Sequence, residues 1–95
     1  MRVTARNFEI TQTLREYIDK RLVYLGKYSN HIIDAEIIFH EERGQYSGEL
    51  ILKVKGRTIK AETRSNDILK VVDELKDIAT RELKKYEEKL KDHRK

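Results

Sequence analysis

The sequence predicts an α+β domain, a βαβββα sandwich in which two helices pack on one face of a four-stranded sheet. Three observations lead to this fold class. Apolar and polar residues alternate in four short stretches, as in half-buried strands, and apolar residues recur every three or four positions in two longer stretches, as in amphipathic helices. The length of 95 residues leaves room for one modest core, so we expect a single domain over residues 1–95.

The first strand is predicted at residues 2–7, and a helix is expected at about residues 11–27. Thr11 and Thr13 are both candidate N-terminal caps of this helix, because a threonine hydroxyl can accept a hydrogen bond from a backbone N–H of the first turn. Gly26 lies where the helix is expected to end. Helical spacing is kept by four apolar residues: Leu14, Ile18, Leu22 and Leu25.

Three further strands follow in the alternating pattern, at about residues 33–40, 49–55 and 58–62. The first connection is a loop around Gly44. The second is a tight hairpin turn at Gly56-Arg57, because a glycine paired with one other residue is typical of two-residue turns.

The predicted turn at Gly56-Arg57 sets the register of the second hairpin. It places Val54 opposite Ile59, so that apolar residues pair on one side of the sheet. On the other side it places Lys53 opposite Lys60, which costs roughly a few tenths of a kcal/mol unless an anion lies over the two charges. This pair therefore favours a nucleic acid as the partner.

A second helix is predicted at about residues 68–89, capped by Ser65-Asn66-Asp67. Residues 91–95 are expected to form a frayed charged tail. The helix carries one continuous apolar stripe: Ile68, Val71, Val72, Leu75, Ala79, Leu83, Tyr86 and Leu90. Both helices need a shared sheet face to cover, and the strand pattern assigns that face to Val3, Ile37, Leu52 and Ile59.

Composition excludes several classes of protein. The chain has no cysteine, which rules out disulfides and thiolate metal sites, and no apolar run reaches the length of a membrane span, so we expect a cytoplasmic protein with no membrane partner. His40-Glu41-Glu42 is the only compact group of acid–base residues, and it lacks the spaced ligands of a metal site. We therefore expect no enzyme activity, metal, cofactor or small-molecule substrate.

Basic residues gather in three places that suit RNA phosphates, although the net charge is only +4. On the second helix, Arg81, Lys85 and Lys89 repeat every four residues and form a row, unless nearby acids make this an ordinary solvated face. The outward sheet face carries Arg2, Arg6, Lys53 and Lys60 together with Glu36, Glu49 and Glu62, so we expect a basic surface with some ion pairs there.

The first helix interleaves basic and aromatic residues, with Arg21 and Lys27 as the expected phosphate contacts. Aromatic rings beside arginine suit RNA, because they stack on unpaired bases. One edge of the helix carries Tyr17, Arg21, Tyr24 and Tyr28. For Tyr17 and Tyr28 a place at the rim of the core is the favoured interpretation, whereas Tyr24 stays open between the two roles.

Two stretches carry a resemblance to a known family: Arg6-Asn7-Phe8-Glu9-Ile10-Thr11 running into Leu14-Arg15-Glu16-Tyr17, and Asp73-x-Leu75-x-Asp77-x-x-x-Arg81-x-Leu83-x-Lys85. Their order and spacing resemble the ribosome hibernation promoting factors, also called ribosome-associated inhibitor or factor Y, over nearly the whole chain. The resemblance favours Thr11 as the helix cap. It implies a fold similar to a double-stranded RNA-binding domain with an added strand.

The resemblance also implies a function: binding to ribosomal RNA of the small ribosomal subunit, in the path of tRNA and mRNA, to silence ribosomes during starvation or stationary phase. Matching basic positions are Arg21, Lys27, Arg81 and Lys85. Ile78 and Tyr24 depart from the family pattern, which often has basic residues there. The chain resembles the short form, which acts with a second hibernation factor.

Two other functions remain open at this point. One is an RNA-binding module for structured RNA outside the ribosome, which would carry the same charges. The other is a protein-interaction regulator that modulates a sigma factor, suggested by relatives of this family.

Overall fold

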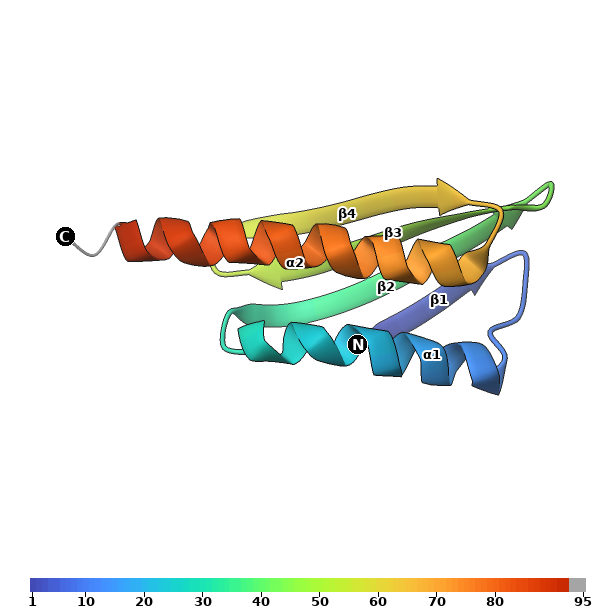
Figure 1. The fold of residues 1–95 in the computed structure, drawn as a ribbon, viewed down its shortest axis with the longest axis horizontal. Coiled ribbons are helices and arrows are strands. Elements are labelled where there is room, and N and C mark those ends of the chain that lie inside the picture. Colours follow the sequence, from blue (N-terminus) through green and yellow to red (C-terminus); the bar gives the residue numbers. More distant parts are fainter. Residues whose placement is uncertain (93–95) are drawn as a thin grey trace.

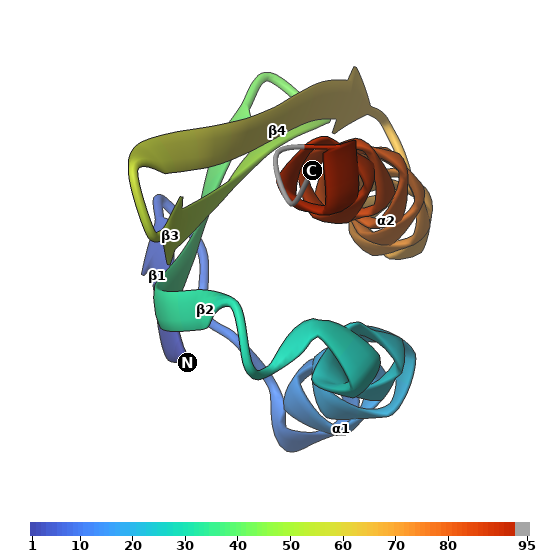
Figure 2. The same ribbon diagram turned by 90° about the vertical axis from the view of Figure 1, so that its left-hand side faces the viewer.

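The computed structural model describes residues 1–92, so residues 93–95 of the predicted tail lie outside the described residues. The elements are β1 (Arg2–Arg6), α1 (Gln12–Leu22), the 3₁₀ helix η1 (Val23–Tyr28), β2 (Ile32–Glu42), β3 (Gln45–Val54), β4 (Arg57–Ser65) and α2 (Ile68–Asp92). Strands lie in the order β1-β2-β3-β4, with β1 parallel to β2 and the other pairs antiparallel. Both helices cover one face of this sheet, which confirms the predicted fold class (Figures 1 and 2).

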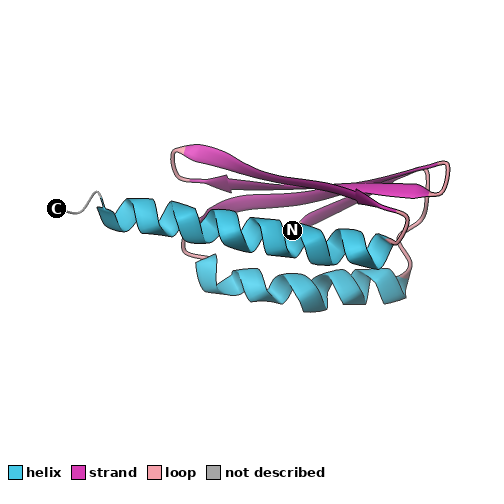
Figure 3. Ribbon diagram, turned by 45° about the horizontal axis from the view of Figure 1, so that its top comes forward, coloured by secondary structure: helices cyan, strands magenta, loops and turns pink. Residues whose placement is uncertain are grey.

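The core lies between the sheet and the helix layer, as Figure 3 shows from the side. Ile37, Leu52 and Ile59 are buried on the predicted face, and Val3 packs against them at the edge. The stripe of α2 is buried as predicted from Val71 to Tyr86, whereas Ile68 is half-buried and Leu90 is exposed. The last turns of α2 extend past the end of the sheet (Figure 1). Leu90 lines an open hollow there with Ile33 and Lys55. Helix α2 also runs further than predicted and includes Lys91 of the expected tail.

Helix α2 approaches β3 closely at Gly48. A Cβ atom there would lie 2.5 Å from Cγ1 of Val71 and 2.8 Å from Cδ1 of Leu75. Contacts this short do not occur between real atoms, so a side chain at position 48 would push the helix away from the sheet. The glycine therefore sets how near α2, and the side chains it carries, lie to the strands.

The two helices begin at caps that the sequence predicted. Thr11 Oγ1 accepts a hydrogen bond from the backbone N–H of Leu14 at 3.1 Å, which identifies Thr11 rather than Thr13 as the cap of α1. At α2, Asp67 Oδ1 accepts from the backbone N–H of Leu69 at 2.9 Å. These side chains satisfy backbone donors that have no partner inside the helix.

Both hairpins differ from the predictions in their turns. The first loop is shorter than expected, because Arg43 and Gly44 both adopt positive φ and the strands continue up to them. In the second hairpin Lys55 and Gly56 form the turn. Gly56 is the third of the four turn residues, and its φ of 89° is the positive value that this position requires.

This turn shifts the register of β3 and β4 by two residues. Lys53 lies opposite Thr58, and Lys60 lies opposite Ile51, so the predicted Lys53–Lys60 pair is wrong. A shift of two leaves every side chain on its original face, because side chains alternate with a period of two. The predicted apolar face therefore survives, while the predicted charge repulsion does not.

Candidate nucleic-acid interface

The 3₁₀ helix η1 sorts its side chains into two lines. Residues three apart lie directly above one another in a 3₁₀ helix, whereas in an α-helix they are offset by about 60° around the axis. Leu25 and Tyr28 accordingly both point into the core, and Tyr24 and Lys27 both lie on the exposed side. The continuous α-helix predicted to residue 27 is wrong from Val23 onward. Tyr28 is therefore buried, and it does not belong to the exposed row of aromatic residues that the α-helical spacing had suggested.

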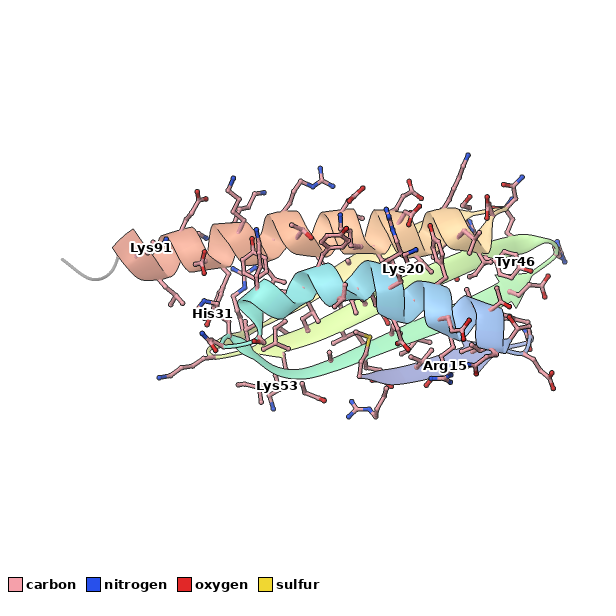
Figure 4. The ribbon with its side chains drawn as sticks, turned by 60° about the horizontal axis from the view of Figure 1, so that its bottom comes forward. Arg15, Lys20, His31, Tyr46, Lys53 and Lys91 are labelled. Atoms are coloured by element: carbon pink, nitrogen blue, oxygen red, sulfur yellow. The ribbon has the colours of Figure 1, made fainter. Side chains whose placement is uncertain are left out.

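A groove separates η1 from α2 on the outer side of the helix layer. It is lined by Lys27, Tyr28, Thr80, Lys84 and Glu87. The α2 side of this groove is formed by Thr80, Lys84 and Glu87. Thr80 and Lys84 continue a line of residues at a spacing of four that begins one turn earlier, and we call it the groove row: Lys76, Thr80 and Lys84. Figure 4 shows the neighbouring Lys20 of α1 extending over the helix layer.

Tyr24 of η1 and Lys76 of α2 meet beside this groove. The Lys76 ammonium lies 4.9 Å from the centroid of the Tyr24 ring, within the range of a cation–π contact. The tyrosine remains 60% exposed, whereas the lysine side chain is only 22% exposed. Lys76 also lies 3.4 Å from Asp77 on the same helix. This pair combines a positive charge with an accessible aromatic surface.

Arg21 joins α1 to α2 through a carboxylate. Its Nε donates to Asp73 Oδ1 at 2.8 Å, and the Tyr17 hydroxyl donates to the same oxygen, also at 2.8 Å. The bond to the charged carboxylate raises the pKa of Tyr17 above its ordinary value, and burial adds to this rise. Arg21 already has an anionic partner, so it braces the two helices in addition to facing the solvent. Tyr17 is half-buried at the rim of the core.

The predicted row of Arg81, Lys85 and Lys89 lies on the other flank of α2, beside the β3–β4 hairpin; we call it the hairpin row. A hollow there is lined by Arg57, Glu82, Lys85, Glu88 and Lys89. Glu82 lies 3.8 Å from Arg57 and 3.4 Å from Lys85, so it neutralises part of this surface. The structure does not bring the hairpin row together with Arg21 and Lys27, because the body of α2 lies between them.

The open face of the sheet is more balanced than predicted. Arg2 Nη2 lies 2.9 Å from Asp34 and 3.6 Å from Glu36, and Lys60 lies 3.3 Å from Glu49. The hydrogen bond from Arg2 holds the pKa of Asp34 below its ordinary value. This face is therefore a surface of ion pairs rather than a continuous basic patch.

Two of the predicted sheet residues remain exposed on that face. Arg6 lies at the end of β1, and Lys53 lies beside Asp34 in the register of β2 and β3. Figure 4 shows the Lys53 side chain pointing away from the helices.

A metal-ligand cluster and a membrane-spanning helix are both absent from the described part of the chain. His40 lies 3.5 Å from Glu42 at the end of β2, but residues 1–92 hold no cluster of three His, Asp or Glu side chains suited to a metal ion. Nor does any helix within these residues combine the length and apolar character that crossing a membrane requires.

The groove row is the part of the site that sequence reasoning missed. Lys76, Thr80 and Lys84 have the same spacing of four as the hairpin row, and that spacing was visible in the sequence. The row was overlooked because Thr80 stands between its two lysines and makes it look less basic. The flank of α2 that faces the first helix depends on packing, so only the structure selects this row.

Comparisons with known proteins agree with this architecture. The family model described as "Sigma 54 modulation protein / S30EA ribosomal protein" matches residues 1–91. The ribosome hibernation promoting factor of Escherichia coli K12 is 30% identical over 93 residues, covering 98% of each chain. The ribosome hibernation promotion factor of Deinococcus radiodurans is 31% identical over 91 residues, which make up 47% of that longer protein.

Solved structures give the same result for the fold. A ribosomal subunit interface protein from Coxiella burnetii superposes with a TM-score of 0.83 and 30% identity, over 90% of this chain and 94% of that one. The N-terminal domain of Thermus thermophilus Protein Y has a TM-score of 0.80 at 22% identity, with the same coverage of 90% and 94%, and supports the fold alone. The chain therefore belongs to the sigma 54 modulation protein / S30EA ribosomal protein family, which includes the ribosome hibernation promoting factors that its sequence resembles.

Proposed function

We propose that this protein is a ribosome hibernation factor that binds the small ribosomal subunit and occupies the path of tRNA and mRNA. The names of its relatives support a role in hibernation. The observation that carries the RNA-binding part is the helix layer, where basic residues line both flanks of α2. Ribosome binding of this kind would take place in the cytoplasm, during starvation or stationary phase.

Several cations of the helix layer are available to phosphates. Among the described residues, Lys27, Arg81 and Lys84 have no carboxylate within the 4.0 Å limit of an ion pair. Neutralising phosphates with such residues releases counterions and makes binding depend steeply on salt. We assign the main contacts to Lys27, Arg81, Lys84, Lys85 and Lys89. Arg21 and the sheet residues Arg2, Arg6, Lys53 and Lys60 are secondary, since several of them already have acidic partners.

The mechanism follows from binding alone. A domain that fills the decoding path excludes tRNA and message by occupying their volume, without forming or breaking bonds. Inhibition should therefore be stoichiometric with ribosomes, and tRNA and this protein should weaken each other's binding reciprocally. We also propose a second hibernation factor as a further partner, as the family resemblance implies.

Sedimentation with separated ribosomal subunits tests the proposal directly. The protein should move with the small subunit, and its affinity should fall on the order of a thousandfold between low and moderate salt if about six phosphates are contacted. Excess tRNA with message should displace it in a filter-binding assay. Occupancy of one small subunit by both tRNA and this protein, with neither affinity altered, would refute the occlusion mechanism.

A role as a protein-interaction regulator is the second candidate, because the matching family model is also described by sigma 54 modulation. Partner binding in that case should survive nuclease treatment and remain nearly indifferent to salt. A third outcome, equal affinity for naked structured RNA and for ribosomes, would indicate an RNA-binding module that acts outside the ribosome.

A further inference from the structure

We propose that Tyr24 and Lys76 form a stacking site for one unpaired nucleobase, and that Lys27 and Lys84, in the adjoining groove, hold the phosphates that follow it along the strand. The inference rests on the proposed function for the identity of the RNA, but not for the chemistry of the site. It assigns a role to Tyr24, which the sequence alone left open between the rim of the core and an RNA contact.

Tyr24 differs from the other four tyrosines of the chain in its surroundings. Tyr28 and Tyr86 are buried, Tyr17 is hydrogen-bonded to Asp73, and Tyr46 packs edge-on against Phe8 at 5.3 Å between ring centroids. Tyr24 alone among them is more than half exposed. Its ring is therefore accessible to a ligand without displacement of core residues.

Lys76 prepares this ring for stacking. The ammonium lies over the ring at 4.9 Å, and its stem is largely covered. The contact restrains the ring before any ligand arrives, which lowers the entropy lost on binding. A base has an apolar aromatic surface of its own, so it stacks on a tyrosine ring whatever its sequence identity.

The charges next to the ring fit the backbone of the same strand. Lys27 is three residues from Tyr24 in η1 and is eclipsed with it, and Lys84 faces Lys27 across the groove. Glu87, which lies 3.3 Å from His31, lines the same groove. A single-stranded nucleotide offers an aromatic base and an adjoining phosphate, which match a ring beside two lysines. A duplex keeps its bases stacked inside and would use only the charges.

Coverage of the core does not explain Tyr24. A ring that closed the rim of the core would be mostly buried, as Tyr28 is, whereas 60% of Tyr24 stays in contact with solvent. Leu25 and Tyr28 already fill the core side of η1. The exposed ring is therefore available to a ligand and is not needed to fill the core.

The first arm of the test uses a short single-stranded oligoadenylate and an abasic chain of the same length, with affinities measured by fluorescence anisotropy. Tyr24→Leu and Tyr24→Lys should each lose roughly 5- to 100-fold in affinity for the oligoadenylate. Neither should lose affinity for the abasic chain. Tyr24→Phe should bind like the parent, as should Val23→Ala, a control at an equally exposed position of η1 outside the groove.

Tyr24→Lys is the decisive variant, because it adds a charge while it removes the ring. Binding of the oligoadenylate by Tyr24→Lys as tightly as by the parent would overturn the stacking site and leave a purely electrostatic groove. Equal losses on the abasic chain and on the oligoadenylate would also overturn it, since the effect would not depend on the base.

The second arm sediments the parent, Tyr24→Leu and Val23→Ala with small subunits. Selective loss of binding with Tyr24→Leu supports the site on the ribosome. Failure of the parent itself to sediment would refute the proposed function, while the oligonucleotide arm would still decide on the stacking site. Weaker binding to subunits without any weakening on the oligoadenylate would overturn the inference and assign Tyr24 to a contact with a ribosomal protein.

Discussion

The two flanks of α2 carry rows with the same spacing but different surroundings. The hairpin row, Arg81, Lys85 and Lys89, lies beside Glu82, which already attracts Arg57 and Lys85. The groove row has acidic neighbours too, because Asp77 lies 3.4 Å from Lys76 and Glu87 lines the groove. It differs in facing η1, where an exposed tyrosine and Lys27 add an aromatic surface and a further charge. The comparison teaches that a row of charges on a helix acquires its chemistry from the element packed alongside it, not from its own spacing.

Disrupting the packing of α2 abolishes both flanks and gives the largest effect. Leu75 is fully buried on the core side of α2, so Leu75→Asp places a charge in the core at a cost of several kcal/mol or more, comparable with the whole stability of about 5–15 kcal/mol for a small domain. Circular dichroism should show an unfolded chain. The control Leu75→Met keeps the volume and should cost less than about 1.5 kcal/mol. A folded Leu75→Asp protein would contradict this core.

Neutralising the basic residues of one α2 flank at a time shows which flank contributes more to binding of the small subunit. We expect both Lys27/Lys76/Lys84→Gln and Arg81/Lys85/Lys89→Gln to reduce the slope of log affinity against log salt by about 0.7–0.9 for each phosphate that is no longer neutralised. The groove triple should lose more affinity for the small subunit, because it also removes the cation beside Tyr24. Titrations at several salt concentrations measure both quantities. An unchanged slope would identify that flank as a solvated face.

Removing the contact of Asp73 with Arg21 and Tyr17 should have a smaller effect. Asp73→Asn removes the charge that holds Arg21, and we expect a loss of stability of under about 1 kcal/mol because the pair is partly exposed. The pKa of Tyr17 should fall back toward its ordinary value, which an alkaline NMR titration measures. Asp77→Asn, on the exposed side of α2, is the matched control. An unchanged Tyr17 pKa would show that Asp73 does not accept its hydroxyl in solution.

The smallest effect is expected on the open sheet face, at Asp34→Asn. The folded-state pKa of Asp34 is lowered, so its stabilising contribution is present above the ordinary value of 3.8 and is lost as the pH falls through the folded pKa. Parent and variant should therefore unfold alike in strong acid, with the parent slightly more stable near neutral pH. A denaturant titration at both pH values checks this, and a difference that grows in acid would reverse the sign.

Much of the fold was predictable because the period of the apolar residues is a local property of the chain. Alternation assigned Ile37, Leu52 and Ile59 to the core face of the sheet, and that assignment survived a register error of two residues. Helix caps are local as well, and Asp67 caps α2 as predicted. The basic residues could likewise be found from the sequence, although their partners could not.

The sequence by itself therefore determined the elements, their buried faces and the family resemblance. Tertiary structure alone decided that η1 tightens at Val23, that Lys76 meets Tyr24, and that Asp73 holds Arg21. The physical reason is the distance along the sequence over which each interaction acts. Periodicity and capping act within a few residues, whereas the rotation of α2 about its axis is set by contacts between segments more than 50 residues apart, such as the one from Arg21 to Asp73.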